Sequence, residues 1–253
     1  MSKQLLIGVF IIAILAIGGF FLYSEQSKTT SQSPSQSTNG NTSQAQGIQF
    51  ENPKKAAHYE SNTPAHGAVL GAPPINVVID FNFDLAKPSS ISITKDGTEV
   101  GLGETTIDTN KLALRRNVDP TASDGTYTVN YKACWPDGSC HDGSFQFAIM
   151  RSEAEKAVDM RNQTTVDIDL ANIAFSPKDI RISKGTKIVW TNSDDAVHYI
   201  NTDSHPAHTY YKDQNSKALN KGDTFSLTFD TPGAYPYHCS AHADSMTGTI
   251  IVE

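Results

Sequence analysis

The chain has 253 residues, enough for two ordinary domains, and carries a formal net charge of −7. Hydrophobic residues make up 38% of the sequence and charged residues 19%, which is typical of a soluble, acidic globular body. The acidic balance argues against nucleic acid as a partner, because binding to phosphates requires a basic face.

Residues 1–23 are predicted to form a membrane anchor. The run from Leu5 to Tyr23 contains no charged residue, and as a helix it would cover roughly 28 Å, close to the thickness of the hydrocarbon layer. Lys3 and the amino terminus favour a cytoplasmic N-terminus, so the body should lie on the extracytoplasmic side of the cell membrane, periplasmic or extracellular. A cleaved signal peptide is the alternative, and it gives the same compartment.

Residues 24–55 are predicted to form a flexible linker. The run SEQSKTTSQSPSQSTNGNTSQAQ (24–46) is rich in Ser, Thr, Gln and Asn and nearly free of apolar side chains. Such a segment cannot bury enough surface to offset its chain entropy. We expect a tether of about 25–30 Å root-mean-square length between the anchor and the body.

Residues 56–150 are predicted to form a β-sandwich. Apolar and polar residues alternate in INVVIDFNF (75–83), TYTVNYKA (126–133) and SFQFAI (144–149). In the first run the alternating residues include Phe81 and Phe83. Runs with a period of two, separated by Gly, Pro and Asp turns, indicate antiparallel strands. The sequence KDGT at 95–98 marks a hairpin turn.

The chain has three cysteines, so at least one thiol is unpaired. Cys134 and Cys140 flank a Pro-Asp-Gly turn signal, which could bring their sulfur atoms close enough to bond. We predict a disulfide between them, and two reduced, buried cysteines are the alternative. Cys239 is then the odd thiol.

A connector at 151–163 separates two β segments. The run RSEAEKAVDMRN (151–162) breaks the β pattern, and Ser152 followed by Glu155 is typical of a capping box, so we expect a short helix. From 164 to 253 the alternation returns in several short runs, which predicts a second sandwich. The expected fold class is therefore all-β, with two Greek-key sandwiches behind an N-terminal transmembrane helix.

The last loop combines three residue types that bind metals. Cys239, His242 and Met246 follow one another as Cys-x2-His-x3-Met within YPYHCSAHADSMTGTIIV (235–252), and His198 follows the predicted strand KIVW upstream. A thiolate, two imidazoles and a weak axial thioether are the ligand set of a mononuclear blue-copper electron-transfer site. Zinc is the competing metal, since it accepts Cys and His but gains little from Met.

Residues 164–253 resemble a plastocyanin-type cupredoxin. The stretches that carry the resemblance are IAFSPKDIRISKGTKIVWTNSDDAVHYI, KGDTFSLTFDTPGAYPYHC and MTGTIIV. The resemblance implies one type 1 copper that cycles between Cu(II) and Cu(I). The implied ligands are His198, Cys239 and His242 in the equatorial plane and Met246 in the axial position. It also implies that His242, flanked by two small alanines, is the exit for electrons.

Three further histidines lie near this motif in the sequence: His205, His208 and His238. His238 precedes Cys239, so its side chain should point to the opposite side of the strand. Each of the three could be an ordinary surface or packing residue. His205 and His208 could also contribute to a second metal site.

Residues 58–149 resemble the CopC-type copper domain, an Ig-like sandwich. The stretches that carry this resemblance are AAHYESNTPAHGAVLGAPPINVVIDF and DGTYTVNYKACWPDGSCHDGSFQFAI. The resemblance implies a second Cu(II) site with His58 and His141 as ligands, joined by the displaced Asp137. A scaffold or docking role without metal is the alternative.

The sequence therefore predicts a membrane-tethered type 1 copper protein that carries single electrons between a redox donor and a redox acceptor. We expect no enzymatic activity. A copper-handling protein for homeostasis or resistance, using both domains, is one alternative. A copper reductase or oxidase is another, but it would need a type 2 centre for which His205 and His208 are the clustered candidates in the sequence.

Overall fold

The computed structural model describes residues 47–253, which belong to one compact unit. The predicted anchor at 1–23 and residues 24–46 of the predicted linker lie outside the described residues. Within 47–253, no helix combines the length and the apolar character needed to cross a bilayer. The described chain is nearly all β, as the sequence predicted.

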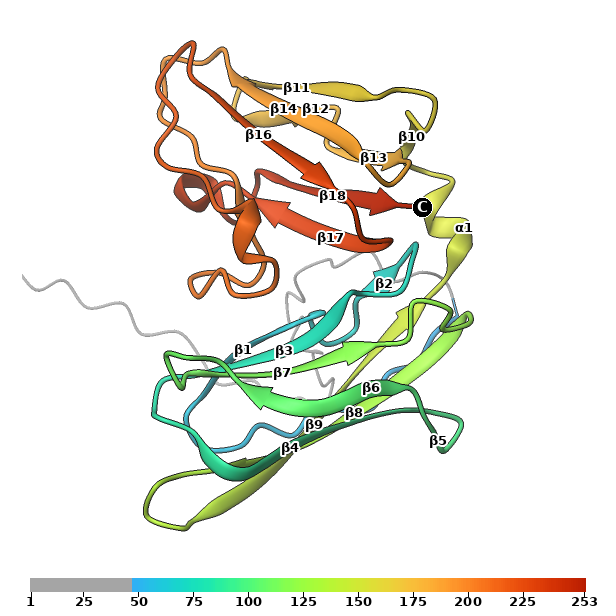
Figure 1. Cartoon of the computed structure of the whole chain (residues 1–253), viewed down its shortest axis with the longest axis vertical. Helices are drawn as coiled ribbons and strands as arrows, with labels where there is room; N and C mark the ends of the chain where they lie inside the picture. The colour runs from blue at the N-terminus through green and yellow to red at the C-terminus, as the bar shows by residue number, and fades with distance from the viewer. Residues whose placement is uncertain (1–46) are drawn as a thin grey trace, which may run out of the picture. The chain divides into compact units, whose positions relative to one another are not determined.

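The first sandwich contains two sheets, with strand orders β1-β3-β7-β6 and β2-β9-β8-β4-β5 (Figure 1). Its strands are β1 (Tyr59–Thr63), β2 (Val69–Leu70), β3 (Asn76–Phe81), β4 (Ala86–Lys95), β5 (Thr98–Glu99), β6 (Gly101–Ile107), β7 (Ala113–Val118), β8 (Gly125–Cys134) and β9 (Cys140–Ile149). Alternate residues of β8 and β9, such as Val129 and Phe147, are buried in one core because successive side chains point to opposite faces.

Strand β3 departs from the predicted alternation. All of its residues are buried, because Val77 and Ile79 face the core of the sandwich while Val78 packs against Ala113 and Tyr210 in a separate apolar cluster. Phe83, which we expected to continue the buried face, lies beyond the end of β3 and is 50% exposed. A strand that is covered on both faces loses the period-two contrast on which the prediction relied.

The second sandwich also has two sheets, with orders β12-β11-β14-β16 and β10-β13-β18-β17-β15 (Figure 1). Its strands are β10 (Val158–Asp159), β11 (Thr165–Ala171), β12 (Ala174–Ser176), β13 (Asp179–Ile182), β14 (Thr186–Asn192), β15 (Asn201–Thr202), β16 (Thr224–Phe229), β17 (Gly233–His238) and β18 (Thr247–Val252). Two 3-10 turns complete it, η1 (Lys212–Gln214) and η2 (Ser240–His242). Its core is centred on Trp190, which is fully buried.

The connector contains a short helix, as predicted, but the helix is capped differently. Helix α1 spans Arg151–Ala154, its N-cap is Met150, and no side chain makes a capping hydrogen bond. The prediction that Ser152 starts a capping box was therefore wrong. Ser152 lies inside the helix because β9 runs on to Ile149, which leaves no earlier polar residue at the cap position.

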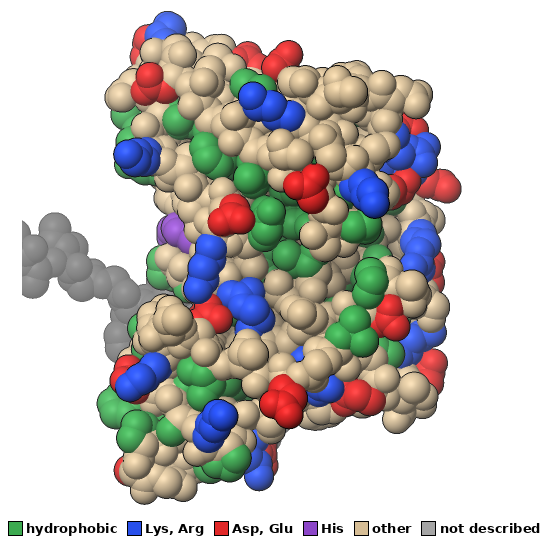
Figure 2. Space-filling view, viewed as in Figure 1, with side chains coloured by type: hydrophobic (Ala, Val, Ile, Leu, Met, Phe, Trp, Pro, Cys, Tyr) green, Lys and Arg blue, Asp and Glu red, His purple; other side chains and the backbone are tan. Residues whose placement is uncertain are grey.

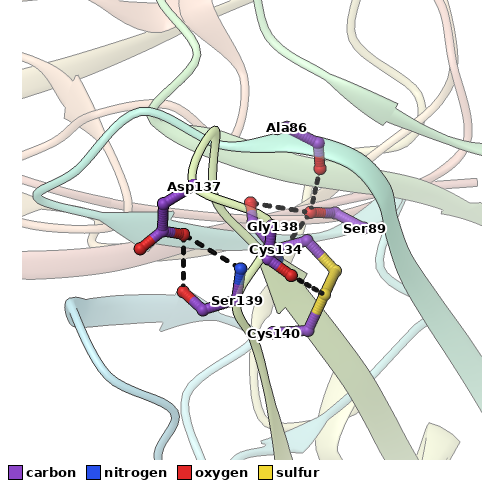
Figure 3. The surroundings of a disulfide bond; sticks show 7 residues. All are labelled: Ala86, Ser89, Cys134, Asp137, Gly138, Ser139 and Cys140. Carbon is purple, nitrogen blue, oxygen red and sulfur yellow. Dashed lines mark hydrogen bonds between the residues drawn. A yellow bond between two sulfur atoms is a disulfide. The ribbon is translucent and has the colours of Figure 1, made fainter.

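The predicted disulfide between Cys134 and Cys140 is confirmed (Figure 3). The two residues pair directly across the β8–β9 hairpin, with Cα atoms 4.0 Å apart. The Asp137 carboxylate accepts hydrogen bonds from the Ser139 amide at 2.9 Å and hydroxyl at 2.7 Å, which fixes the turn. The disulfide therefore crosslinks the β8–β9 hairpin next to a turn that is also fixed by hydrogen bonds.

Polar and apolar contacts join the two sandwiches within this unit. The Tyr210 hydroxyl accepts a hydrogen bond from the Ile75 amide at 2.9 Å and donates one to the Ala234 carbonyl at 2.7 Å. The buried Asp80 carboxylate accepts hydrogen bonds from the hydroxyls of Ser204 and Thr209. The segment around 203–210 is therefore held by side chains of the first sandwich.

Charges of both signs are interspersed on the face drawn in Figure 2, where Lys and Arg lie close to Asp and Glu. No broad basic patch stands out on this face. This mixed surface agrees with the net charge of −7 and with the argument against a nucleic-acid partner.

Replacing Tyr210 with Phe should destabilise the protein by about 1–3 kcal/mol, because the change removes the hydrogen-bond partner of the buried Ala234 carbonyl and of the half-buried Ile75 amide while it keeps the ring. Chemical denaturation followed by circular dichroism measures the difference. Tyr211→Phe, at a half-buried neighbour, is the matched control and should have little effect. Equal stability of the two variants would contradict this account of the contact.

Candidate metal centre

The loop between β17 and β18 brings Cys239 and His242 together. The two strands pair antiparallel (Figure 1), and beyond them the Cys239 amide donates to the Met246 carbonyl at 3.0 Å. The Met246 amide in turn donates to the His242 carbonyl at 2.9 Å. This short loop, closed by its own backbone, holds the cysteine and the histidine on one side with little conformational freedom.

His198 comes from the other sheet of the sandwich and lies beside Cys239 and His242. It follows β14, and its backbone exchanges hydrogen bonds with Leu219 at 3.1 and 2.9 Å. The side chain of His198 and the whole of Cys239 have no exposed surface. The Cys239 Sγ atom lies 3.6 Å from Nδ1 of His198 and 3.6 Å from Nδ1 of His242.

These distances fit a metal ion bound by all three residues. An ion about 2.3 Å from sulfur and about 2.0 Å from nitrogen separates its ligand atoms by about 3.5–3.8 Å. The ligand atoms of His198, Cys239 and His242 all lie within 4.8 Å of one another. The donor set of one sulfur and two imidazoles also suits copper.

Asp194 orients His198. Its carboxylate accepts hydrogen bonds from the amides of Asn172 and Ile173 and lies 2.9 Å from Nε2 of His198. The amide of Ile173, followed by the contact with His198, lowers the pKa of Asp194 to about 2. An ionised carboxylate can only accept, so His198 donates from Nε2, and in the neutral ring Nδ1 keeps its lone pair for a metal.

The Cys239 sulfur has one further polar neighbour. The amide of Tyr199 donates to Sγ at 3.4 Å, so the buried sulfur has a backbone hydrogen-bond partner. Met246 is buried, 1% exposed, and belongs to the same apolar cluster as Cys239. Its role as the axial ligand stays a prediction.

A second group of imidazoles lies beside this centre, and the sequence did not fully reveal it. His205, His208 and His238 place their ligand atoms within 4.8 Å of one another. Burial, followed by the neighbouring His238 and His205, lowers the pKa of His208 to about 4. The signal was the position of His238 directly before Cys239, which turns its side chain toward the segment that carries the other two.

The copper site predicted in the first sandwich stays a prediction. His58, Asp137 and His141 are exposed and form no cluster of ligand atoms of the kind found in the second sandwich. His58 and His141 each lie edge-on to Trp135, with ring centroids 5.3 Å away, and His58 also stacks on Phe83. A second copper at this place is not confirmed.

A β-sandwich with a buried cysteine and two imidazoles around one point defines the class of mononuclear copper-binding domains of the cupredoxin type. Comparison with known proteins agrees. Residues 162–253 match the model for copper binding proteins of the plastocyanin/azurin family, and residues 59–150 match the CopC domain.

Individual relatives are similar over a third or more of the chain. Plastocyanin from Scenedesmus fuscus is 30% identical over 93 residues, which are 34% of this chain and 92% of the relative. Amicyanin-alpha from Methylorubrum extorquens is 29% identical over 106 residues, 42% of this chain and 87% of the relative. The chain therefore belongs to the plastocyanin/azurin family of copper-binding proteins.

A solved structure, a purple cupredoxin from Nitrosopumilus maritimus, is also similar. It is 29% identical, with a TM-score of 0.31, over 35% of this chain and 99% of that chain. The predicted recognition of a cupredoxin domain behind a CopC domain is confirmed by the family matches. Cupredoxins of this kind are blue-copper electron carriers, so the second domain is of the electron-carrier type.

The metal-free protein should show a single reactive thiol, and only after unfolding. Cys239 has no exposed surface and the other two cysteines are joined, so Ellman's reagent should react slowly with the native chain. In guanidinium without reductant it should find one thiol per chain, and Cys239→Ser should remove it. Three thiols, or none, would contradict the assignment of the cysteines.

Proposed function

We propose that the protein carries single electrons between redox partners through one type 1 copper held by His198, Cys239, His242 and Met246. The observation that supports this most directly is the position of Cys239 Sγ, 3.6 Å from Nδ1 of each of two histidines in a buried site. The copper, when bound, supplies a one-electron couple between Cu(II) and Cu(I).

The residues around the site favour fast electron exchange because they hold the ligands in place. Cys239, His242 and Met246 share one loop closed by backbone hydrogen bonds, and His198 is fixed by Asp194. A site that does not rearrange between oxidation states has a small reorganisation cost. The protein thus positions the four proposed ligands and keeps water away from the buried Cys239 and His198.

His242 is the proposed exit for electrons. It is the one of the three clustered residues that is partly exposed, while His198 and Cys239 are buried. Ala241 beside it is exposed and Ala243 is half-buried. Small apolar side chains around a ligand edge allow close approach of a redox protein, which serves as the donor or acceptor.

The protein is further proposed to act outside the cytoplasm, tethered to the cell membrane. The support is the uncharged run from Leu5 to Tyr23 and the polar run 24–46 behind it. The disulfide between Cys134 and Cys140 is in keeping with an oxidising compartment. Membrane-associated redox partners would then lie within reach of the tether.

Copper handling is the second candidate function, and the match of residues 59–150 to the CopC domain is the observation that favours it. It requires copper binding by the first sandwich. Because His58 and His141 are exposed and not clustered with a third ligand, the geometry gives this candidate less support than electron transfer.

Copper-loaded protein should be intensely coloured, because sulfur-to-Cu(II) charge transfer absorbs visible light. Cys239→Ser should abolish the band, since oxygen replaces the sulfur. Met246→Leu should keep the band and change the reduction potential, because an axial ligand tunes the metal without supplying the colour. Visible absorption and redox titration measure both effects. A colourless Cu(II) form of the unmodified protein would exclude the proposed function.

Asp194→Asn should weaken copper binding by about 10–100-fold, because the hydrogen bond that orients His198 changes. Asp195→Asn is the matched control, since that side chain is 91% exposed and pairs only with Lys221 at 2.9 Å. Competition with a chelator of known affinity measures the difference. Identical affinities in the two variants would show that the contact with Asp194 does not orient the ligand.

A further inference from the structure

Three histidines on the far side of the same strand end form a second constellation of nitrogen donors. The ring centroids of His205, His208 and His238 lie 5.0–5.4 Å apart. Nε2 of His208 is 3.1 Å from Nε2 of His238. Two nitrogens bound at about 2.0–2.1 Å to one ion are separated by about 2.9–3.4 Å. The spacing is therefore that of two ligands on one metal.

The ring of His238 is oriented so that Nε2 points toward His208 and Nδ1 toward Asp203. It is 2% exposed, and its Nδ1 lies 3.0 Å from the Asp203 carboxylate. The carboxylate accepts, so Nδ1 carries the proton, and in the neutral ring Nε2 keeps its lone pair. A histidine whose other nitrogen donates to a carboxylate is the usual arrangement around a bound metal.

Residues of the first sandwich hold the segment that carries His205 and His208. Asp80 is buried and accepts hydrogen bonds from Ser204 at 2.6 Å and from Thr209 at 2.7 Å. These two residues lie on either side of the histidines in the chain. Preorganised ligands lose less conformational entropy when an ion binds.

Arg115 also holds the segment that carries His205 and His208. Its guanidinium donates to the carbonyls of Thr209 at 2.6 Å and Tyr210 at 2.9 Å, and it also pairs with the Asp108 carboxylate at 3.1 Å. The backbone after His208 is thus fixed by a charged side chain of β7. The first sandwich, whichever ligands it binds itself, supports the geometry of the second cluster.

We propose that His205, His208 and His238 bind a second copper ion, with a coordination position open to a small anion. Three imidazoles suit several divalent metals, and Cu(II) has the highest affinity in the divalent series. His205 is exposed and His208 half-buried, so one side of the cluster faces solvent. Three protein ligands and one open position are typical of metal sites that accept a substrate.

This site goes beyond the proposed electron carrier, and it is independent of the sulfur of Cys239. Cys239 and His238 are consecutive, and their side chains belong to different clusters. The two sites are therefore joined through a single peptide unit, yet they have no ligand in common. Their spectra can be read separately.

The test uses the full chain without a histidine tag, loaded with Cu(II) and studied by metal analysis and electron paramagnetic resonance. We expect two coppers per chain, the second with an axial signal split by nitrogen. Azide, the small-anion probe, should shift only the second signal. His205→Ala and His208→Ala should each weaken Cu(II) binding at this site at least about 10-fold and keep the colour. Cys239→Ser should lose the colour and keep the response to azide.

His58→Ala is the control, since His58 lies in the first sandwich, outside the cluster, and should leave both signals unchanged. The proposal is overturned if the chain holds a single copper with no response to azide. It is also overturned if the axial signal survives both His205→Ala and His208→Ala, or disappears in His58→Ala. If the unmodified chain, loaded with copper, has no colour, that result would count against the proposed electron carrier and not against the second site.

Discussion

The pairing of the last two strands, β17 and β18, is the constraint on which the metal centre depends. It carries Cys239 to the end of a buried strand and returns the chain through a short loop, so that His242 and Met246 come back toward the same point. The thiol is buried among apolar side chains around Trp190, where an unpaired polar group is costly. The imidazoles of His198 and His242 and the amide of Tyr199 supply the polar partners that make the position tolerable.

The end of β17 places two neighbouring side chains on opposite faces of the sheet. Because successive side chains point to opposite sides, Cys239 faces the core while His238 faces the segment 203–209. That segment has little structure of its own, and side chains from the first sandwich fix it, chiefly Asp80 and Arg115. The two sandwiches are therefore more than neighbours in sequence. Side chains of the first sandwich fix the backbone that carries two histidines of the second.

The expectations that were wrong share a cause. Phe83 and Ser152 were assigned from local patterns, and both assignments assumed that a strand or a helix ends where its pattern ends. In the folded chain, β3 is covered on both faces and ends at Phe81, and β9 ends at Ile149 directly before the helix cap Met150, so tertiary packing set the boundaries. The assignment of His58 and His141 to one site rests on resemblance and stays a prediction; in the structure both rings pack against Trp135.

The sequence by itself determined the all-β class and the hairpin disulfide, and it predicted a metal centre around Cys239 and His242, because these depend on short-range features. Alternation with a period of two, a Pro-Asp-Gly turn between two cysteines, and Cys, His and Met on one loop are all visible within a few residues. Only the tertiary structure decided that Asp194 holds His198 and that His205, His208 and His238 meet. His238 lies about thirty residues after His205 and His208, and sheet packing brings these positions together, whereas Asp194 is only four residues before His198 but meets it through a fold of the loop after β14 that no residue pattern announces.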